Sequence, residues 1–181
     1  IESGVRQGAA MDTTAIRLLG PPTIVHEGRA TVLAGRRYHA VLAALGLDVG
    51  RPVAAESLID ALWGDDPPLS ARKTLQGFVL RLRRRLPAGA IHTEGSSYRL
   101  DLAAGAVDAV DFRALVDGTR DLAPEQALTQ LEQALGLWRG TPFTELTSER
   151  FARERAHLEE RRRMAEESRC EALLCVGRVA E

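Results

Sequence analysis

The segment SARKTLQGFVLRLRRRLP, residues 70–87, carries the pattern that most constrains how this chain folds. Its apolar residues recur at the spacing i, i+3, i+4, i+7 and i+11, which places them on one face of an α-helix. These residues are Leu75, Phe78, Val79, Leu82 and Leu86. Because such a face has to be buried, the segment predicts a helix on a packed domain, capped by Ser70 and continuing to Leu86, where Pro87 stops it.

The opposite face of this helix is basic, and two of its residues are unusual for a face that only meets water. Gly77 lies in the middle of the helix, where glycine costs about 1 kcal/mol relative to alanine. Leu80 is an apolar residue on the same outer face. Glycine permits close approach of a base edge, and leucine can contact a thymine methyl group. A solvated basic helix stays open as the alternative, because arginine on a solvent face is common.

The charge of the chain is divided unequally along its length. The net charge is −1 over 181 residues, but residues 16–102 carry 12 basic and 8 acidic side chains, whereas residues 103–181 carry 11 and 15. A basic and an acidic half predict different partners for the two halves. No run of about 18 uncharged apolar residues occurs, so we expect no membrane-spanning segment. Residues 1–15 are polar and small and are expected to be a flexible leader.

The residues that most often carry catalysis or bind metals show no productive spacing. Cys170 and Cys175 lie five apart on one expected helix, so their side chains point in different directions. No disulfide is expected, which fits a reducing bacterial cytoplasm. The histidines have no partner at ligand spacing, and there is no phosphate loop, nucleophile elbow or pair of catalytic carboxylates. We therefore expect no enzyme, no cofactor and no metal.

The order of predicted elements around the basic helix is informative. Residues 16–33 favour a small antiparallel sheet, because short pieces rich in Thr, Ile and Val alternate with Gly and Pro. Two helices are expected within residues 35–50 and 51–64, followed by a loop with two prolines. After the basic helix, residues 90–102 alternate around a Gly-Ser-Ser turn, which predicts a β-hairpin. This order is that of a winged helix-turn-helix, whose last helix enters the major groove of DNA.

The second half is predicted to be helical. Residues 103–110 are expected to form a linker. Helices are expected around Phe112 and from Pro124 towards Gly140, and a long third helix at about 149–177. This third helix has a narrow apolar seam of Phe151, Leu158, Ala165 and Leu173. The pattern suggests a stack of helical hairpins, and a further helix would be expected where the sequence stops, as in a fragment of a longer protein.

Several stretches, taken together, resemble a known family. The stretches VAAESLIDALWGDDPPLSARKTLQGFVLRLRRRL and IHTEGSSYRL, with the preceding LLGPPTIVHEGRATVLAGRRYHAVLAAL, resemble the OmpR-type winged helix. The later LEQALGLWRGTPFTEL resembles the bacterial transcriptional activation domain, a tetratricopeptide-like helical module. In this order they are similar to the Streptomyces antibiotic regulatory protein family.

This resemblance implies an α+β winged helix-turn-helix of the OmpR type at residues 16–102, followed by the start of an all-α, tetratricopeptide-like domain at 111–181. It also implies a sequence-specific transcriptional activator of antibiotic biosynthetic genes. Such a protein binds direct repeats in double-stranded promoter DNA as a head-to-tail homodimer and recruits RNA polymerase. The alternative is a protein-interaction module in which the helical half is active and the basic half is a scaffold.

The resemblance assigns roles to particular residues. Lys73 and Thr74 are expected to anchor phosphates, and Arg99 to contact a groove or the DNA backbone. The expected base-reading surface consists of Gln76, Gly77, Leu80 and Arg81, with Arg83 and Arg84 on phosphate or base. Asp65 and Asp66, in the loop before the basic helix, are expected to meet a basic surface of polymerase such as a sigma factor; a solvated turn stays open for them. For Tyr98, Trp63 and Trp138, packing is the favoured role.

Overall fold

The structure, a computed structural model, describes residues 14–32 and 34–177. Two small sheets and a set of helices follow in the order β1 (Ala15–Arg17), β2 (Thr23–His26), β3 (Arg29–Val32), α1 (Arg36–Leu47), β4 (Pro52–Ala54), α2 (Ala55–Trp63), α3 (Ala71–Arg83), β5 (Ile91–Glu94), β6 (Ser97–Leu100), α4 (Asp108–Asp117), α5 (Pro124–Gly136) and α6 (Glu149–Cys175). The first 13 residues of the expected leader lie outside the described residues. Its last two do not belong to a leader, because Thr14 is buried and Ala15 begins β1.

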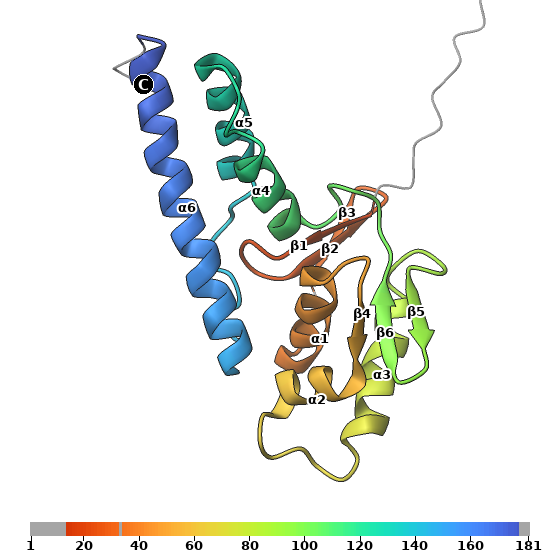
Figure 1. The fold of residues 1–181 in the computed structure, drawn as a ribbon. Helices are drawn as coiled ribbons and strands as arrows, with labels where there is room; N and C mark the ends of the chain where they lie inside the picture. The colour runs from red at the N-terminus through yellow and green to blue at the C-terminus, as the bar shows by residue number, and fades with distance from the viewer. Residues whose placement is uncertain (1–13, 33, 178–181) are drawn as a thin grey trace, which may run out of the picture.

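Both expected β structures are present, and one of them is larger than expected. Strands β1, β2 and β3 form an antiparallel sheet in that order. The expected hairpin consists of β5 and β6, and β6 also pairs with β4, which the sequence did not predict. Val53 in β4 lies opposite Tyr98 in β6, so this strand joins the hairpin to the start of α2 (Figure 1).

Helix α1 is buried on every side rather than on one face. Each residue from Tyr38 to Gly46 is buried, so the prediction of an amphipathic helix underestimated its burial. A helix that is apolar all round is typical of the centre of a core. Helix α1 contacts α2, α3, α4 and β6, and it is therefore the element against which the others are placed.

Helix α3 forms as predicted but is shorter. It ends at Arg83, and the backbone N–H groups of Arg85 and Leu86 both bond to the carbonyl of Leu82 in a closing turn. Ser70 stands at the N-cap position, yet its side chain makes no capping hydrogen bond. The helix can end early because Pro87 disfavours helical backbone in the residue before it.

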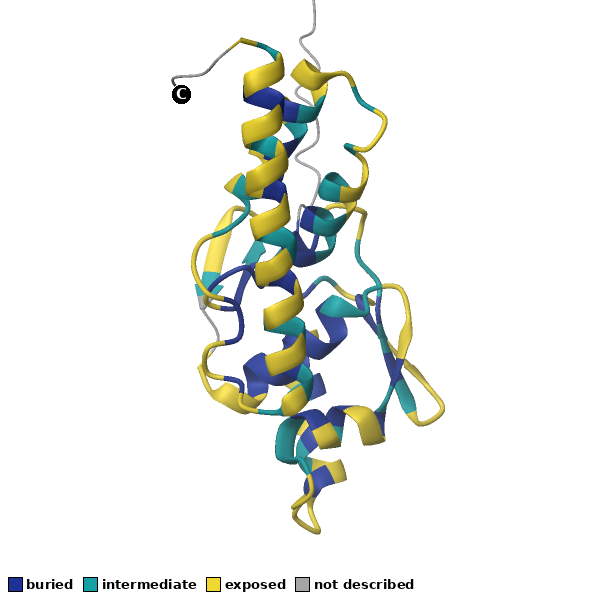
Figure 2. Cartoon of the chain, turned by 60° about the vertical axis from the view of Figure 1, so that its left-hand side comes forward, coloured by how far each residue is buried: buried dark blue, intermediate teal, exposed yellow. Residues whose placement is uncertain are grey.

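The helical half consists of α4 and α5, with the long α6 along them (Figure 1). The predicted seam of α6 is confirmed: Phe151, Leu158 and Ala165 have no exposed surface, and Leu173 is buried. Figure 2 shows most of the rest of α6 as exposed, with buried residues at intervals. Cys170 and Cys175 are both free and exposed.

The expected linker at residues 103–110 is wrong over its second half, which belongs to the core. Val107 forms a parallel bridge with Ile16, and the Ile16 N–H donates to the Ala106 carbonyl over 2.7 Å. Asp108 begins α4, is buried, and accepts hydrogen bonds from the backbone N–H of Leu18 at 2.5 Å and of Leu19 at 3.2 Å. One apolar core runs through both halves, so this segment joins them rigidly.

Burial raises the pKa of Asp108, and the bonds from Leu18 and Leu19 and the charge of Arg139 act in the opposite direction. The carboxylate satisfies two backbone donors that would otherwise lack a partner. A buried donor left without its acceptor costs about 1–3 kcal/mol.

We therefore expect Asp108→Ala to lower the free energy of unfolding by about 2–4 kcal/mol, as measured by urea denaturation. Asp108→Asn keeps one acceptor oxygen and should lose clearly less. The matched control is Asp111→Ala, in the same helical turn, because the Asp111 side chain makes no hydrogen bond in the described structure. It should change stability by about 0.5 kcal/mol. Equal losses for Asp108→Ala and Asp111→Ala would contradict the proposed role of this carboxylate.

Candidate nucleic-acid interface

Helix α3 presents a continuous outward face made of the residues expected to meet DNA. Lys73, Gln76, Gly77, Arg81 and Arg84 are exposed, and Thr74 is half-buried. Leu80 has half of its surface exposed, which is unusual for a leucine on a packed domain. A Cβ built on Gly77 would meet nothing within 4 Å, so the glycine leaves open space on this face. The structure thus brings the predicted α3 residues together on one surface.

The opposite side of α3 is fixed by the core. Leu75, Val79 and Leu82 are fully buried, and the Phe78 ring lies 6.3 Å from that of Tyr38 in α1. At the N-terminal end of α3, Arg72 pairs with Glu56 of α2. Burial raises the pKa of Tyr38, an effect that the nearby Arg85 and Arg81 oppose. The outward face is therefore held by packing against α1 and α2 and cannot rotate inward.

The cations of this face are free. The side chains of Lys73, Arg81 and Arg84 make no hydrogen bond or ion pair in the part of the chain that the structure describes. Unpaired arginine and lysine side chains on a rigid helix can bind anions without first breaking an internal ion pair. This property separates them from most arginines of the helical half, which are paired with carboxylates.

Arg83 differs from its neighbours, because it ties the end of α3 to the β5–β6 hairpin, which we call the wing. Its Nε donates to the Ile91 carbonyl over 3.2 Å, and its Nη2 donates to the Thr93 hydroxyl over 2.7 Å. Nothing in the sequence pattern indicates this role, since Arg83 stands in a run of arginines and its partners lie on another element. In this conformation its guanidinium positions the wing.

Arg99 on β6 is also engaged. Its Nε donates to Glu94 over 2.7 Å, and its Nη1 lies 3.2 Å from Asp101. Asp101 lies in addition 3.3 Å from His92. Contact with DNA would require Arg99 to leave these carboxylates or to share them. Tyr98 beside it is buried, which supports the packing role rather than contact with DNA.

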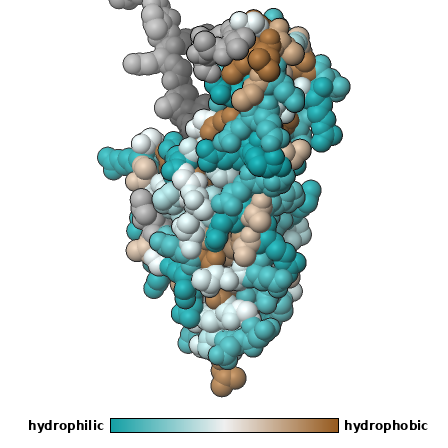
Figure 3. All heavy atoms as spheres, turned by 90° about the vertical axis from the view of Figure 1, so that its left-hand side faces the viewer, coloured by the Kyte–Doolittle hydropathy of each residue, from teal (hydrophilic) through white to brown (hydrophobic). Residues whose placement is uncertain are grey.

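The loop between α2 and α3 projects from the molecule. Asp65 and Asp66 are exposed, as expected. Leu69, which was not among the residues predicted from the sequence, has a relative exposure of 110%, more than any other large apolar side chain described. Figure 3 shows an apolar projection at the lower end of the molecule, the end where Figure 1 places this loop. The signal in the sequence that could have identified Leu69 is an apolar residue directly after Pro67 and Pro68, in a loop.

Both tryptophans pack rather than offer a free face. Trp138 lies edge-on to Phe112 at 5.3 Å, with the Arg162 guanidinium 4.9 Å from its ring. Trp63 carries the guanidinium of Arg37 at 5.5 Å. These contacts support packing and cation–π roles for both residues.

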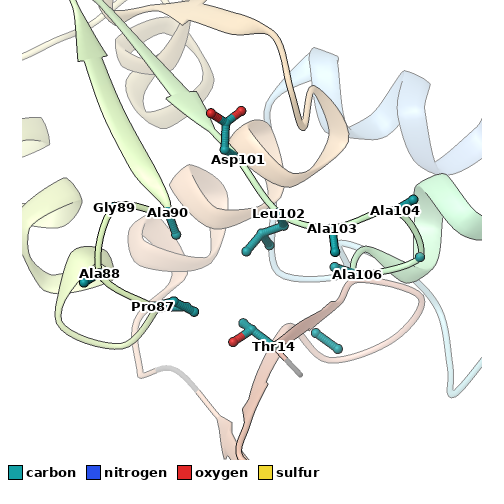
Figure 4. A pocket seen from close by; sticks show the side chains of 12 residues that line it. Thr14, Pro87, Ala88, Gly89, Ala90, Asp101, Leu102, Ala103, Ala104 and Ala106 are labelled. Carbon is teal, nitrogen blue, oxygen red and sulfur yellow. The ribbon is translucent and has the colours of Figure 1, made fainter. Parts of the chain in front are cut away.

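A cavity of about 420 Å³ lies where the wing meets the segment leading to α4 (Figure 4). Its walls come from residues 87–90 and 101–106 and from Thr14, and most are small and apolar. Asp101 is its acidic side chain, and Arg99 and His92 already engage that carboxylate. The cavity therefore offers a ligand apolar walls and little to orient it.

Two kinds of feature are absent from residues 14–32 and 34–177. No three His, Cys, Asp or Glu side chains there are grouped so that they could hold a metal ion. Within the same residues, every helix is too short or too polar to cross a bilayer.

The described residues thus form an α+β fold in which an outward basic helix and an adjoining hairpin share one core with a set of helices. Comparison with known proteins agrees. The family described as bacterial transcriptional activator domain matches residues 107–181. Regulatory protein DnrI of Streptomyces peucetius is 34% identical over 91% of this chain and 66% of its own length. Transcriptional regulator RedD of Streptomyces coelicolor is 30% identical over 82% of this chain and 46% of its own length.

The solved structure of Mycobacterium tuberculosis EmbR in complex with a low-affinity phosphopeptide is similar in fold. Its TM-score is 0.83 at 30% identity, covering 92% of this chain and 47% of that one. The chain thus spans two thirds or less of the length of these relatives. It belongs to the Streptomyces antibiotic regulatory protein family of transcriptional regulators.

The tie made by Arg83 can be tested without DNA. Arg83→Ala should speed hydrogen exchange of the backbone amides in β5 and lower the free energy of unfolding by about 0.5–1.5 kcal/mol, because two hydrogen bonds between α3 and the wing are lost. Arg84→Ala is the matched control, since its side chain is exposed and makes no hydrogen bond in the described structure. If both variants exchange alike, Arg83 does not hold the wing.

Proposed function

We propose that this protein is a sequence-specific DNA-binding transcriptional activator. The observation that carries the proposal is the outward face of α3. Free cations, an open glycine and an exposed leucine lie together on a helix that the core prevents from turning. The major groove of B-DNA admits an α-helix and presents a distinct pattern of donors, acceptors and methyl groups for each base pair. An α3 docked there places Gln76, Gly77, Leu80 and Arg81 at base edges.

The flanking residues then position the helix. Lys73 and Thr74 at its beginning and Arg84 at its end are placed to meet phosphates on either side of the groove. Arg83 contributes by holding the wing, which faces the neighbouring groove or backbone in this class of motif. Arg99 contributes when it exchanges Glu94 or Asp101 for a phosphate, a change in which one charge-assisted bond replaces another.

The wider role follows from the family. Control of antibiotic biosynthetic genes, binding to direct repeats and head-to-tail pairing of two copies on DNA are proposed on the strength of that membership. A protein acting on a bacterial chromosome works in the cytoplasm. Activation would require contact with RNA polymerase, and the exposed α2–α3 loop is our candidate for it. Its two aspartates favour a basic partner such as a sigma factor, and Leu69 adds an apolar tip that a complementary socket can bury.

DNA selected from a random pool, followed by binding measurements at two salt concentrations, tests the proposal. Each neutralised phosphate contributes about −0.9 to the slope of log K against log salt concentration. With Lys73 and Arg84 as the phosphate contacts, one protomer should show a slope of about −2 and two on a repeat about −4. Arg81→Ala should cost about 1–3 kcal/mol on the selected site and much less on random DNA. Equal losses would reassign Arg81 to phosphate, and failure to select any sequence would refute the proposal.

Gly77 provides a sharper test of how close the helix comes. Gly77→Glu should abolish DNA binding while leaving the fold intact, because the added side chain meets open space in the free protein. Gly77→Ala adds one methyl group and should raise helix stability by about 1 kcal/mol, so circular dichroism of both variants separates folding from binding. Normal affinity of the glutamate variant would show that α3 is not docked with this face towards DNA.

The α2–α3 loop should matter for activation and not for DNA affinity. We expect Leu69→Ser, and separately Asp65→Asn with Asp66→Asn, to retain affinity for the selected site within about twofold, since surface changes are usually within about 0.5 kcal/mol. Transcription with purified polymerase should fall in both. Leu174→Ser, which changes an exposed leucine at the far end of α6, is the control. Unchanged transcription by the loop variants would remove this loop from the polymerase contact.

A further inference from the structure

A second, polar pocket lies away from the wing. It has a volume of about 430 Å³ and is formed by the start of α1, the end of α2 with the following turn, and the segment just before α6. Its walls therefore come from both halves of the protein. In Figures 1 and 2, α6 and the wing lie on different sides of the winged helix. None of the residues that line the pocket belongs to α3, the helix that we propose to bind DNA.

The cationic side chains of this pocket are Arg36 and Arg37, neighbours in the first turn of α1. In the described part of the chain neither arginine forms an ion pair or a hydrogen bond. Arg37 stacks over the Trp63 ring at 5.5 Å. Packing therefore directs Arg37 on one side, and the side-chain hydrogen-bonding groups of both arginines stay unused. Arginine forks of this kind match the oxygens of a phosphate group.

The backbone adds to this charge. Helix α1 begins at the pocket with Gly35 as its N-cap and no acidic residue in its first turn. The positive end of the helix dipole is thus not offset by the helix itself, and helix N-termini favour anions. Asp66 and the carboxyl end of α2 contribute the opposite sign to the same walls. These negative groups disfavour a ligand that carries negative charge throughout. They can also accept hydrogen bonds from hydroxyl or amino groups of a ligand.

From this arrangement we infer that the pocket binds a small phosphate monoester, with the phosphate at Arg36 and Arg37 and the hydroxyl or amino groups of the ligand towards Asp66. The volume falls within the range of about 300–1,000 Å³ typical of small-molecule sites. Because the walls come from both halves, the bound ligand reinforces the junction between the winged helix and α6. The inference is independent of DNA binding by α3.

Inorganic phosphate and a sugar phosphate, glucose 6-phosphate, are the probes. Isothermal titration calorimetry of the full chain at low ionic strength should show one site for each, with the sugar phosphate binding more tightly. At ten times the dissociation constant, the melting temperature should rise by about 3–6 °C. The double variant Arg36→Gln with Arg37→Gln should bind at least ten times more weakly. The control Arg29→Gln with Arg51→Gln, which changes two exposed arginines outside the pocket, should bind within twofold of the parent.

The other outcomes each exclude the inference. No saturable binding of phosphate, equal weakening in both double variants, or equal displacement by chloride would mean that no built site exists. Sugar phosphate binding no more tightly than phosphate would refute the part assigned to Asp66. Affinity for the selected DNA, measured in parallel, should be within twofold of the parent for the Arg36 and Arg37 variant. A large loss there would mean that these arginines meet DNA phosphates instead, whereas failure of DNA binding by the parent protein would affect only the function proposed above.

Discussion

The burial of α1 is the constraint on which the rest of the structure depends. This helix is enclosed on all sides, and α2, α3, α4 and β6 all contact it. The side chains of α1 therefore determine where the outward face of α3 points and where β6 lies. A protein interior packs as densely as an organic crystal, so one helix in its centre transmits position between elements that do not touch each other. The direction of α3 is a consequence of this packing and not of its own sequence alone.

The same core extends into the helical half, and this has a functional consequence. Leu18, Phe112 and Phe151 belong to one cluster, and Asp108 bonds to the backbone of the segment between β1 and β2. Arg150 of α6 adds an ion pair at 2.6 Å to Asp48, which follows α1. Two domains on a flexible linker could adopt many relative orientations. A shared core fixes one orientation, so that α6 keeps a set position relative to α3.

The sequence predicted the elements whose signal is local. The apolar face of α3, the wing hairpin and the apolar seam of α6 could be recognised, because in each of them the pattern of apolar residues repeats within one segment. Strand β4 was missed because its three residues carry a signal only through their partner, with Val53 opposite Tyr98. The burial of residues 106–109 and the tie from Arg83 to Ile91 were missed for the same reason. Each depends on a contact between segments far apart in the chain, which spacing within one segment does not report.

The use of arginine illustrates why residue type alone did not separate the surfaces. On α6, Arg162 pairs with Glu166, and Arg163 lies between Glu160 and Glu167. Such exposed pairs contribute little to stability, and they leave little positive charge for a partner. On α3, Lys73, Arg81 and Arg84 have no carboxylate beside them, so their charge extends outward. Both helices are rich in arginine, yet these arginines of α6 are paired with glutamates of the same helix, whereas the basic residues Lys73, Arg81 and Arg84 of α3 are not paired with carboxylates of their own helix. The distribution of acidic residues at i+3 and i+4, more than the number of arginines, therefore marks the surface able to bind a polyanion.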